Sequence, residues 1–220
     1  RYREPPNPAV WKGNLEYLLP APETQKKVKH MGALPQNKAP DFYSHLSAME
    51  TTSALGFCFL ILTAARTSEV TGAQWTEIDL KNRLWTIPAE RMKMERQHQV
   101  TLSSEAVRVL NRAKECNDSL YVFPSYTGRG LSGGAFLSIM RKRFPHLLGI
   151  ATPHGFRSVF RDFAEEQNRF GQHAIELCLA HVNKNKVESS YLRTLMIEQR
   201  RVIMQEWADF LVEGKGKGNG

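Results

Sequence analysis

Apolar residues recur at helical spacing through most of the chain after residue 40. Phe42 and Leu46 lie on one predicted apolar face, and Asp41 before them is a suitable helix cap. Residues 55–62 are apolar on all sides, which is typical of a buried central helix. The pattern therefore predicts helical structure from Asp41 past residue 65.

The hydrophobic period changes to two between residues 75 and 102. Three short stretches alternate β-branched and aromatic residues with polar ones, at 76–80, 84–87 and 99–102. They predict three short antiparallel strands, the last two joined by the loop 90–97, which is basic. A basic hairpin tip is usually a solvated edge that resists aggregation, but it can also reach a phosphate.

Helical periodicity returns after the strands. One predicted helix is capped by the serine at position 103 or 104, and another runs from Ser132 to about residue 143. The segment from Thr152 fits a helix start, with a hydroxyl cap and a proline in the first turn. Residues 195–212 form an amphipathic helix. Together these elements predict an α+β, mainly α-helical fold with a small three-stranded antiparallel sheet.

The first 40 residues differ from the rest of the chain. They hold seven of the eleven prolines together with a basic run, and dense proline suits an extended linker or peripheral arm. We expect residues 1–40 to be a linker that follows a missing upstream domain. Residues 41–213 are expected to form one domain, and residues 214–220 a flexible basic tail.

Composition narrows the class of partner and the compartment. The chain is 41% hydrophobic and 24% charged, with a formal net charge of +8 and a pI near 9.5; this favours polyanionic partners, chiefly nucleic acid. The three cysteines lack paired spacing, which argues for a reducing compartment and against zinc fingers or a disulfide framework. The longest apolar run, residues 54–65, is too short to cross a membrane. We therefore expect a cytoplasmic protein with no membrane partner.

The segment 152–191 carries the most suggestive chemistry. His154 and Arg157 are three residues apart at a predicted helix start, so they share a face, and His181 and Tyr191 follow. Two cationic side chains, a second histidine and a tyrosine can converge on one phosphate. Each residue also has an ordinary interpretation, since a lone tyrosine is usually core or surface and His181 could be a buried, hydrogen-bonded histidine.

Arg66 leaves the predicted buried helix and is followed by Glu69 in ARTSEV. An arginine at such a place is costly unless it is paired or faces an anion. Taken alone, a salt bridge between these two residues is the simpler interpretation. In the context of the other basic residues, Arg66 becomes a candidate for phosphate binding, and Glu69 its structural partner.

Taken in order, these segments resemble the tyrosine recombinase family, specifically the integrases of prophages and genomic islands. ARTSEV is similar to the family's first arginine box, and RMKM before Val100-Thr101-Leu102 to its β-hairpin lysine. HGFRS resembles the second box, and LAHVNKNKVESSY the L-G-H…Y box. The chain departs from the family at Ala64 and Ala180, where glycine is usual. The residues matching the family's six catalytic positions are Arg66, Lys93, His154, Arg157, His181 and Tyr191.

The resemblance implies a catalytic domain at 41–213, preceded in family members by DNA-binding domains that are missing here. It implies site-specific cleavage and rejoining of DNA through a covalent 3′-phosphotyrosyl intermediate, with integration or excision of a prophage or genomic island. Tyr191 would be the nucleophile, His154 its base and Lys93 the general acid. Arg66 and Arg157 would bind the phosphate, and either His154 or His181 would add a hydrogen bond. The resemblance also implies a reaction that needs neither a metal nor ATP or another cofactor.

The implied partners are double-stranded DNA attachment sites, in a nucleoid-associated bacterial enzyme. A tetramer on DNA formed through the C-terminal helix is expected, with a monomer when free, as are accessory DNA-bending or directionality factors. Contacts to the DNA backbone are expected from Arg91, Arg96, Arg141 and Lys142. Two alternatives remain: strand relaxation of the type IB topoisomerase kind, and a non-catalytic DNA-binding module with the same fold.

Overall fold

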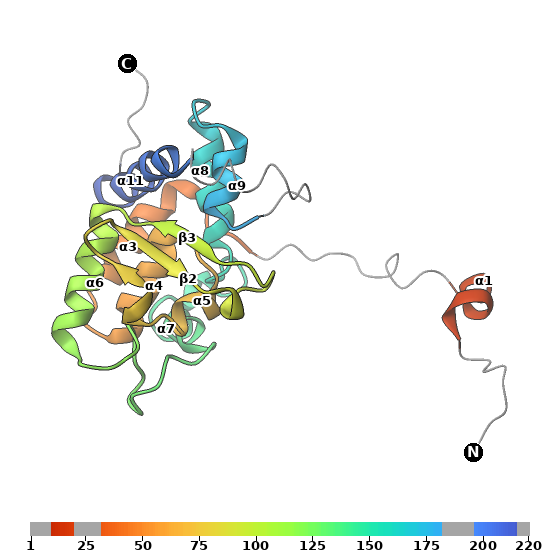
Figure 1. Cartoon of the computed structure of the whole chain (residues 1–220), viewed down its shortest axis with the longest axis horizontal. Coiled ribbons are helices and arrows are strands. Elements are labelled where there is room, and N and C mark those ends of the chain that lie inside the picture. The colour runs from red at the N-terminus through yellow and green to blue at the C-terminus, as the bar shows by residue number, and fades with distance from the viewer. Residues whose placement is uncertain (1–9, 20–31, 182–195, 215–220) are drawn as a thin grey trace. The chain divides into compact units, whose positions relative to one another are not determined.

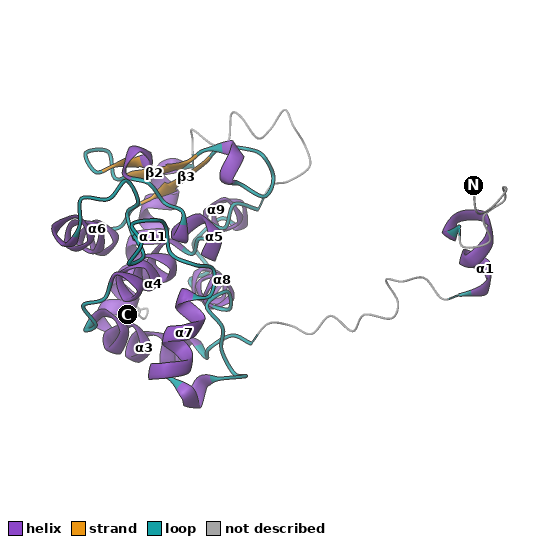
Figure 2. Cartoon of the chain, turned by 90° about the horizontal axis from the view of Figure 1, so that it is seen from below, coloured by secondary structure: helices purple, strands orange, loops and turns teal. Residues whose placement is uncertain are grey.

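The computed structural model describes residues 10–19, 32–181 and 196–214. The chain divides into two compact units, residues 1–30 and residues 31–220. In the described part of the first unit, an irregular turn at Trp11–Leu15 leads into the short helix α1 (Glu16–Leu18), and neither element buries a residue. The second unit is a mainly helical body with one small sheet (Figures 1 and 2).

The described body is built from helices and three strands in an α+β arrangement, as predicted. The helices are α3 (Ala39–Ser47), α4 (Thr52–Thr63), α5 (Thr67–Thr71), α6 (Ser104–Cys116), α7 (Ala135–Arg143), α8 (Phe156–Glu166), α9 (Gln172–Cys178) and α11 (Ile197–Glu213). The strands are β1 (Ile78–Asp79), β2 (Leu84–Ile87) and β3 (His98–Thr101).

Helix α4 lies at the centre of the body (Figure 1) and packs against α3, α6, α7 and α11. The Thr51 hydroxyl caps it by accepting a hydrogen bond from the Ala54 amide at 3.3 Å, and every residue from 54 to 63 is buried. The predicted buried central helix is therefore confirmed. The prediction of unbroken helix from Asp41 was wrong in detail, because α3 already begins at Ala39 and the chain turns between α3 and α4.

The three strands form an antiparallel sheet in the order β1-β2-β3, as predicted, although β1 is only two residues long. Trp85 on β2 lies opposite Ile78 on β1 and Val100 on β3. The indole of Trp85 is fully buried, with its ring centroid 5.2 Å from that of Phe59 on α4. This contact attaches the sheet to the central helix, and Figure 2 shows the strands on one side of the helices.

Helix α11 closes the body from the C-terminal side, where it contacts α3, α4, α6, α8, α9 and β3 of its own chain. Trp207 lies against Phe163 of α8 at 5.2 Å between ring centroids, and its Nε1 donates to the Ile61 carbonyl at 2.8 Å. The predicted amphipathic helix thus packs on its own domain.

The body extends back to residue 32, ahead of the boundary expected at 41. Leu34 and Ala39 are buried in its core, and the Gly32 carbonyl accepts a hydrogen bond from the Thr152 amide at 3.1 Å. Within the described ranges, no helix has the length and apolarity needed to span a membrane, and no cluster of three or more His, Cys, Asp or Glu side chains could hold a metal ion.

Candidate active site

Arg66 stands at the turn between α4 and α5. Helix α4 ends at Thr63, its C-cap residue Ala64 has a left-handed backbone (φ +49°), and Arg66 then occupies the N-cap of α5. Glu69 holds it in place: one carboxylate oxygen lies 2.7 Å from Arg66 Nη1, and the other accepts from the Arg66 amide at 2.8 Å. Glu69 is 2% exposed, whereas the Arg66 side chain is 22% exposed. The expected pairing with Glu69 is present, and part of the guanidinium still faces solvent.

Arg157 is carried by the first turn of α8. The Thr152 hydroxyl accepts from the Gly155 amide at 3.0 Å, as expected for a cap, but the regular helix begins at Phe156 rather than at Pro153. His154 therefore lies in the turn before α8. Glycine is needed at 155, since a Cβ there would collide with the Gly32 carbonyl. The prediction that His154 and Arg157 share one face of a helix is therefore wrong in detail, because only Arg157 lies in the helix and His154 lies in the turn before it.

The guanidinium of Arg157 is buried, at 6% exposure. Its Nη1 donates to the carbonyl of Ala64 at the end of α4, and its Nη2 donates to the carbonyl of Leu179 after α9 at 2.7 Å. Arg157 thus joins the ends of two helices that are distant in sequence. Its Nη2 also lies 3.3 Å from His181 Nε2, which brings the third sequence segment to the same point.

His181 follows α9 through a residue with left-handed backbone, Ala180 (φ +52°). Its amide donates to the Glu176 carbonyl at 2.9 Å, and its ring Nδ1 lies 2.5 Å from a carboxylate oxygen of the same glutamate. The second ring nitrogen faces Arg157. The ring is 44% exposed, so it can contact both the buried arginine and a molecule that arrives from solvent.

The electrostatics of the cluster show that four predicted residues lie close together. Partial burial lowers the pKa of His154, and the positive charges of Arg157, Arg66 and His181 lower it further. Burial lowers the pKa of Arg157 to about 10, Arg66 adds to the effect, and Glu69 and Glu176 oppose it. Such mutual repulsion between cations is relieved by a bound anion. The cluster therefore has the charge to hold an anion, and the planar forks of two arginines match the oxygens of a phosphate.

Lys93 is exposed in the loop between β2 and β3. The base of this loop is fixed by Arg91, which points inward rather than into solvent. Its Nη1 pairs with the Glu77 carboxylate and its Nη2 donates to the Glu69 carbonyl. The loop that carries Lys93 is therefore attached to the same turn of α5 that positions Arg66.

The other predicted DNA contacts lie at different places. Arg96 is half-buried in the same loop, while Arg141 and Lys142 are exposed at the end of α7. Tyr191 lies outside the described residues. Sequence reasoning missed Glu176, which the sequence marks only as an acidic residue five positions before His181.

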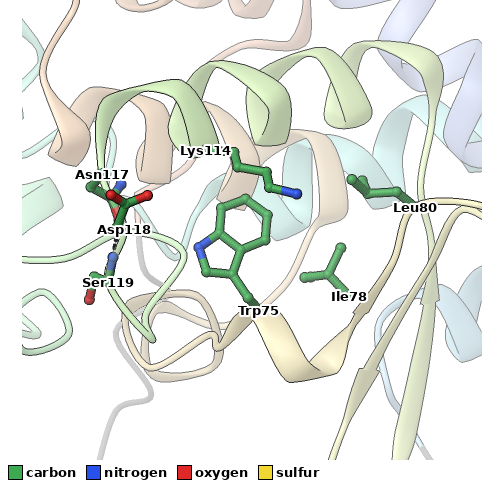
Figure 3. A pocket seen from close by; sticks show the side chains of 7 residues that line it. All are labelled: Trp75, Ile78, Leu80, Lys114, Asn117, Asp118 and Ser119. Atoms are coloured by element: carbon green, nitrogen blue, oxygen red, sulfur yellow. Dashed lines mark hydrogen bonds between the residues drawn. The ribbon is translucent and has the colours of Figure 1, made fainter.

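The body also has a surface pocket of about 360 Å³ between the sheet and the C-terminal end of α6 (Figure 3). Trp75 and Lys114 point into it, and its other lining residues are Ile78, Leu80, Asn117, Asp118 and Ser119. Among the predicted site residues that the structure describes, none lines this pocket.

Comparison with known proteins agrees with the resemblance. Residues 33–197 match the phage integrase family. The chain is 37% identical over 164 residues to prophage integrase IntA of Escherichia coli K12, covering 74% of this chain and 39% of that protein. It is 31% identical over 209 residues to the integrase of Enterobacteria phage P4, covering 87% and 48%. The chain thus spans less than half the length of these two relatives.

Solved structures share the fold at low sequence identity. XerA recombinase superposes with a TM-score of 0.56 at 20% identity, covering 78% of this chain and 66% of that one. A lambda integrase tetramer bound to a Holliday junction gives 0.57 at 17%, covering 73% and 50%. The family match over most of the body, together with this fold, shows that the chain belongs to the phage integrase family, as a tyrosine recombinase catalytic domain.

Proposed function

We propose that this chain is the catalytic part of a site-specific DNA recombinase, an integrase that cleaves and rejoins DNA through a 3′-phosphotyrosyl intermediate on Tyr191. Its biological reaction would be integration or excision of a prophage or genomic island. The observation that carries the proposal is the contact of three distant segments in one cationic cluster. Arg157 reaches both the Ala64 carbonyl beside Arg66 and the ring of His181.

The cluster suits the transition state of phosphodiester cleavage. The phosphorus becomes five-coordinate and its non-bridging oxygens gain negative charge, so fixed cationic donors stabilise this state more than the ground state. Arg66 and Arg157 supply planar forks that match phosphate oxygens. Glu69 and the two carbonyl acceptors of Arg157 hold these forks before DNA arrives, so little reorganisation is needed during the reaction.

Proton transfers complete the mechanism. A phenol with a pKa of about 10 is a weak nucleophile at neutral pH, so Tyr191 needs a base. His154 suits that role because its lowered pKa keeps the imidazole neutral, and therefore able to accept a proton, at pH 7. Lys93 would protonate the departing 5′ oxygen. The phosphotyrosyl bond then accepts attack by a second 5′ hydroxyl, which restores the phosphodiester without ATP.

The proposed partner is double-stranded DNA carrying an attachment site. Lambda integrase, which shares the fold, has been solved as a tetramer on a Holliday junction and as a dimer on a core site. By analogy we propose a tetramer on DNA, assisted by accessory bending or directionality factors, in the nucleoid of the cytoplasm. The segment before residue 32 would connect the catalytic domain to DNA-binding domains like those that precede it in family members.

The test is capture of the covalent intermediate. The chain is incubated with nicked suicide duplexes carrying candidate attachment sites, and a protein–DNA adduct that resists denaturant is sought. Wild type should form the adduct and Tyr191→Phe should not. A wild-type chain that binds a site but never becomes attached to it would instead be a DNA-binding module. Relaxation of plasmids that lack any site would favour a topoisomerase.

A further inference from the structure

Glu176 contacts the proposed active site but has no role in the mechanism above. It lies on α9, and its two carboxylate oxygens have different partners. Oε2 lies 2.5 Å from Nδ1 of His181, and Oε1 lies 2.9 Å from Nη2 of Arg161 on α8. The carboxylate therefore bridges the active-site histidine and the helix that carries Arg157.

We propose that Glu176 is a positioning residue for His181: it sets the tautomer and ring orientation in which the Nε2 lone pair accepts from Arg157 Nη2, and so helps to hold that guanidinium at the scissile phosphate. The inference rests on the proposed function, because it assigns a purpose to the ring of His181. The new element is the Glu176 carboxylate, which orients the His181 ring before DNA binds.

The hydrogen bonds define the tautomer. A carboxylate only accepts hydrogen bonds, so the Nδ1 that contacts it must carry a proton. In the neutral ring the other nitrogen, Nε2, then holds a lone pair, and it lies 3.3 Å from the Arg157 Nη2 donor. Both contacts are satisfied by the Nδ1–H tautomer. The alternative Nε2–H tautomer would place a lone pair against the carboxylate and a proton against the guanidinium.

The local backbone brings the two side chains together. The left-handed turn at Ala180 returns the chain toward α9, and the His181 amide bonds to the carbonyl of Glu176 at 2.9 Å. The histidine is thus tied to the same glutamate through both its backbone and its ring. A residue of ordinary backbone conformation at 180 would send the chain in a different direction.

Glu176 is in turn held by α8. Arg161 lies one helical turn after Arg157, and it also pairs with Glu165 at 2.8 Å through Nε. Helix α8 therefore supplies both Arg157, which contacts Nε2 of the His181 ring, and Arg161, which holds the glutamate that contacts Nδ1. Because Glu176 is only 24% exposed and Arg161 40%, the bridge is partly shielded from solvent.

The variants separate hydrogen bonding from general stability. Glu176→Ala removes the acceptor. Glu176→Gln keeps the length and an acceptor oxygen, whereas Glu176→Asp keeps the charge but is too short to hold the contact. Glu165→Ala is the matched control, because Glu165 shares the Arg161 partner without touching His181 in the described structure.

The first measurement is ¹⁵N NMR of the histidine ring in the chain without DNA, with the signal assigned through His181→Asn. Wild type and Glu165→Ala should show the Nδ1–H tautomer at neutral pH. Glu176→Ala and Glu176→Asp should shift toward Nε2–H, and Glu176→Gln should stay close to wild type. An unchanged Nδ1–H ring in Glu176→Ala would overturn the proposal, and so would loss of that tautomer in Glu165→Ala.

The second measurement is single-turnover adduct formation on the suicide duplex, alongside affinity for the same DNA. Glu176→Ala and Glu176→Asp should slow adduct formation by about 10- to 100-fold, by analogy with the loss when the orienting partner of a metal-bound histidine is removed. Glu176→Gln should retain more activity than Glu176→Asp, and affinities should stay within about threefold of wild type.

The outcomes distinguish this inference from the function on which it rests. Adduct formation by Glu176→Ala and Glu176→Asp at the wild-type rate refutes the positioning role and leaves the recombinase proposal intact. Absence of any adduct with wild type refutes the recombinase proposal. The NMR measurement still tests whether Glu176 sets the tautomer of His181. If Glu176→Ala does not fold, the comparison of Glu176→Gln with Glu176→Asp decides the result by itself.

Discussion

The two departures from the family pattern, Ala64 and Ala180, make a quantitative prediction about stability. Both replace a glycine of the family, and both have left-handed backbone, with φ of +49° and +52°. Both residues contact or adjoin the candidate active site: the Ala64 carbonyl accepts a hydrogen bond from Arg157, and Ala180 directly precedes His181. The perturbation is Ala64→Gly or Ala180→Gly.

The expected magnitude is a balance of three effects. Glycine removes a left-handed penalty of about 1–2 kcal/mol for a residue with a Cβ. Against this, it adds unfolded-state entropy worth about 0.4–1 kcal/mol and loses a buried methyl worth up to about 0.8 kcal/mol. The effects nearly cancel, so we expect both variants to unfold with a free energy within about 0.5 kcal/mol of wild type.

Ala113→Gly is the matched control. Ala113 is fully buried in the interior of α6, where the backbone is right-handed. Here glycine relieves nothing, and the loss of helix propensity and of the methyl should together lower the free energy of unfolding by about 2 kcal/mol. For a chain of this size that corresponds to a fall in Tm of about 4–8 °C.

Urea and thermal unfolding, followed by circular dichroism, measure all three variants under identical conditions. We expect a clear gap in the free energy of unfolding between Ala113→Gly and the other two variants. Equal losses at positions 64, 113 and 180 would show that the left-handed backbone stores no strain at Ala64 and Ala180, and would refute the expected balance.

Three further predictions concern single side chains. Arg91→Ala should lower the free energy of unfolding by about 2 kcal/mol, because it leaves the nearly buried Glu77 without its charged partner. Arg96→Ala, the control, should change this free energy by less than about 0.5 kcal/mol. Equal effects of the two substitutions in urea unfolding would contradict the inward role of Arg91. The pKa of His154 is lowered, and a base acts in its neutral form. The rate of adduct formation should therefore rise with pH through a midpoint below the ordinary histidine pKa of about 6.5. A midpoint above that value in the pH–rate profile would exclude His154 as the base. Lys93→Ala should lose about 10²–10⁴-fold in cleavage rate and recover on DNA with sulfur in place of the departing 5′ oxygen, since a thiolate needs no acid; failure to recover would remove Lys93 from that role.

Several parts of the fold followed from local pattern. The run of apolar residues at 55–62 predicted the buried helix α4, and the alternation around Trp85 predicted the sheet, because burial on all sides and burial on one side leave different periods in a sequence. The break between α3 and α4 was missed, since the apolar spacing continues across it. The exact start of α8 was missed because capping chemistry at Thr152 fits a short turn as well as a helix.

The site was predictable only in part, for a different reason. Arg66, His154, Arg157 and His181 were found by their motifs, and the fold brings these four together. Motif reasoning treated Arg91 as a DNA contact because it is basic and lies in a loop; only the structure shows its acidic and carbonyl partners on other segments.

Glu176 was missed because its meaning depends on the turn at Ala180, which local sequence does not reveal. Tyr191 lies outside the described residues, so its role stays a prediction.

The most direct test of the account is whether Arg66 and Arg157 act on the transition state rather than on binding. Single-turnover adduct formation and affinity for the same duplex are measured for wild type, Arg66→Ala, Arg157→Ala and Arg157→Lys, with the exposed Arg143→Ala as control. We expect both alanine variants to form the adduct at least about 10²-fold more slowly, with less than tenfold loss of affinity. Arg157→Lys should also be slower, because lysine lacks the planar fork of arginine. Arg143→Ala should react at the wild-type rate on saturating DNA. Adduct rates near wild type in Arg66→Ala and Arg157→Ala, or losses wholly accounted for by weaker binding, would contradict the account.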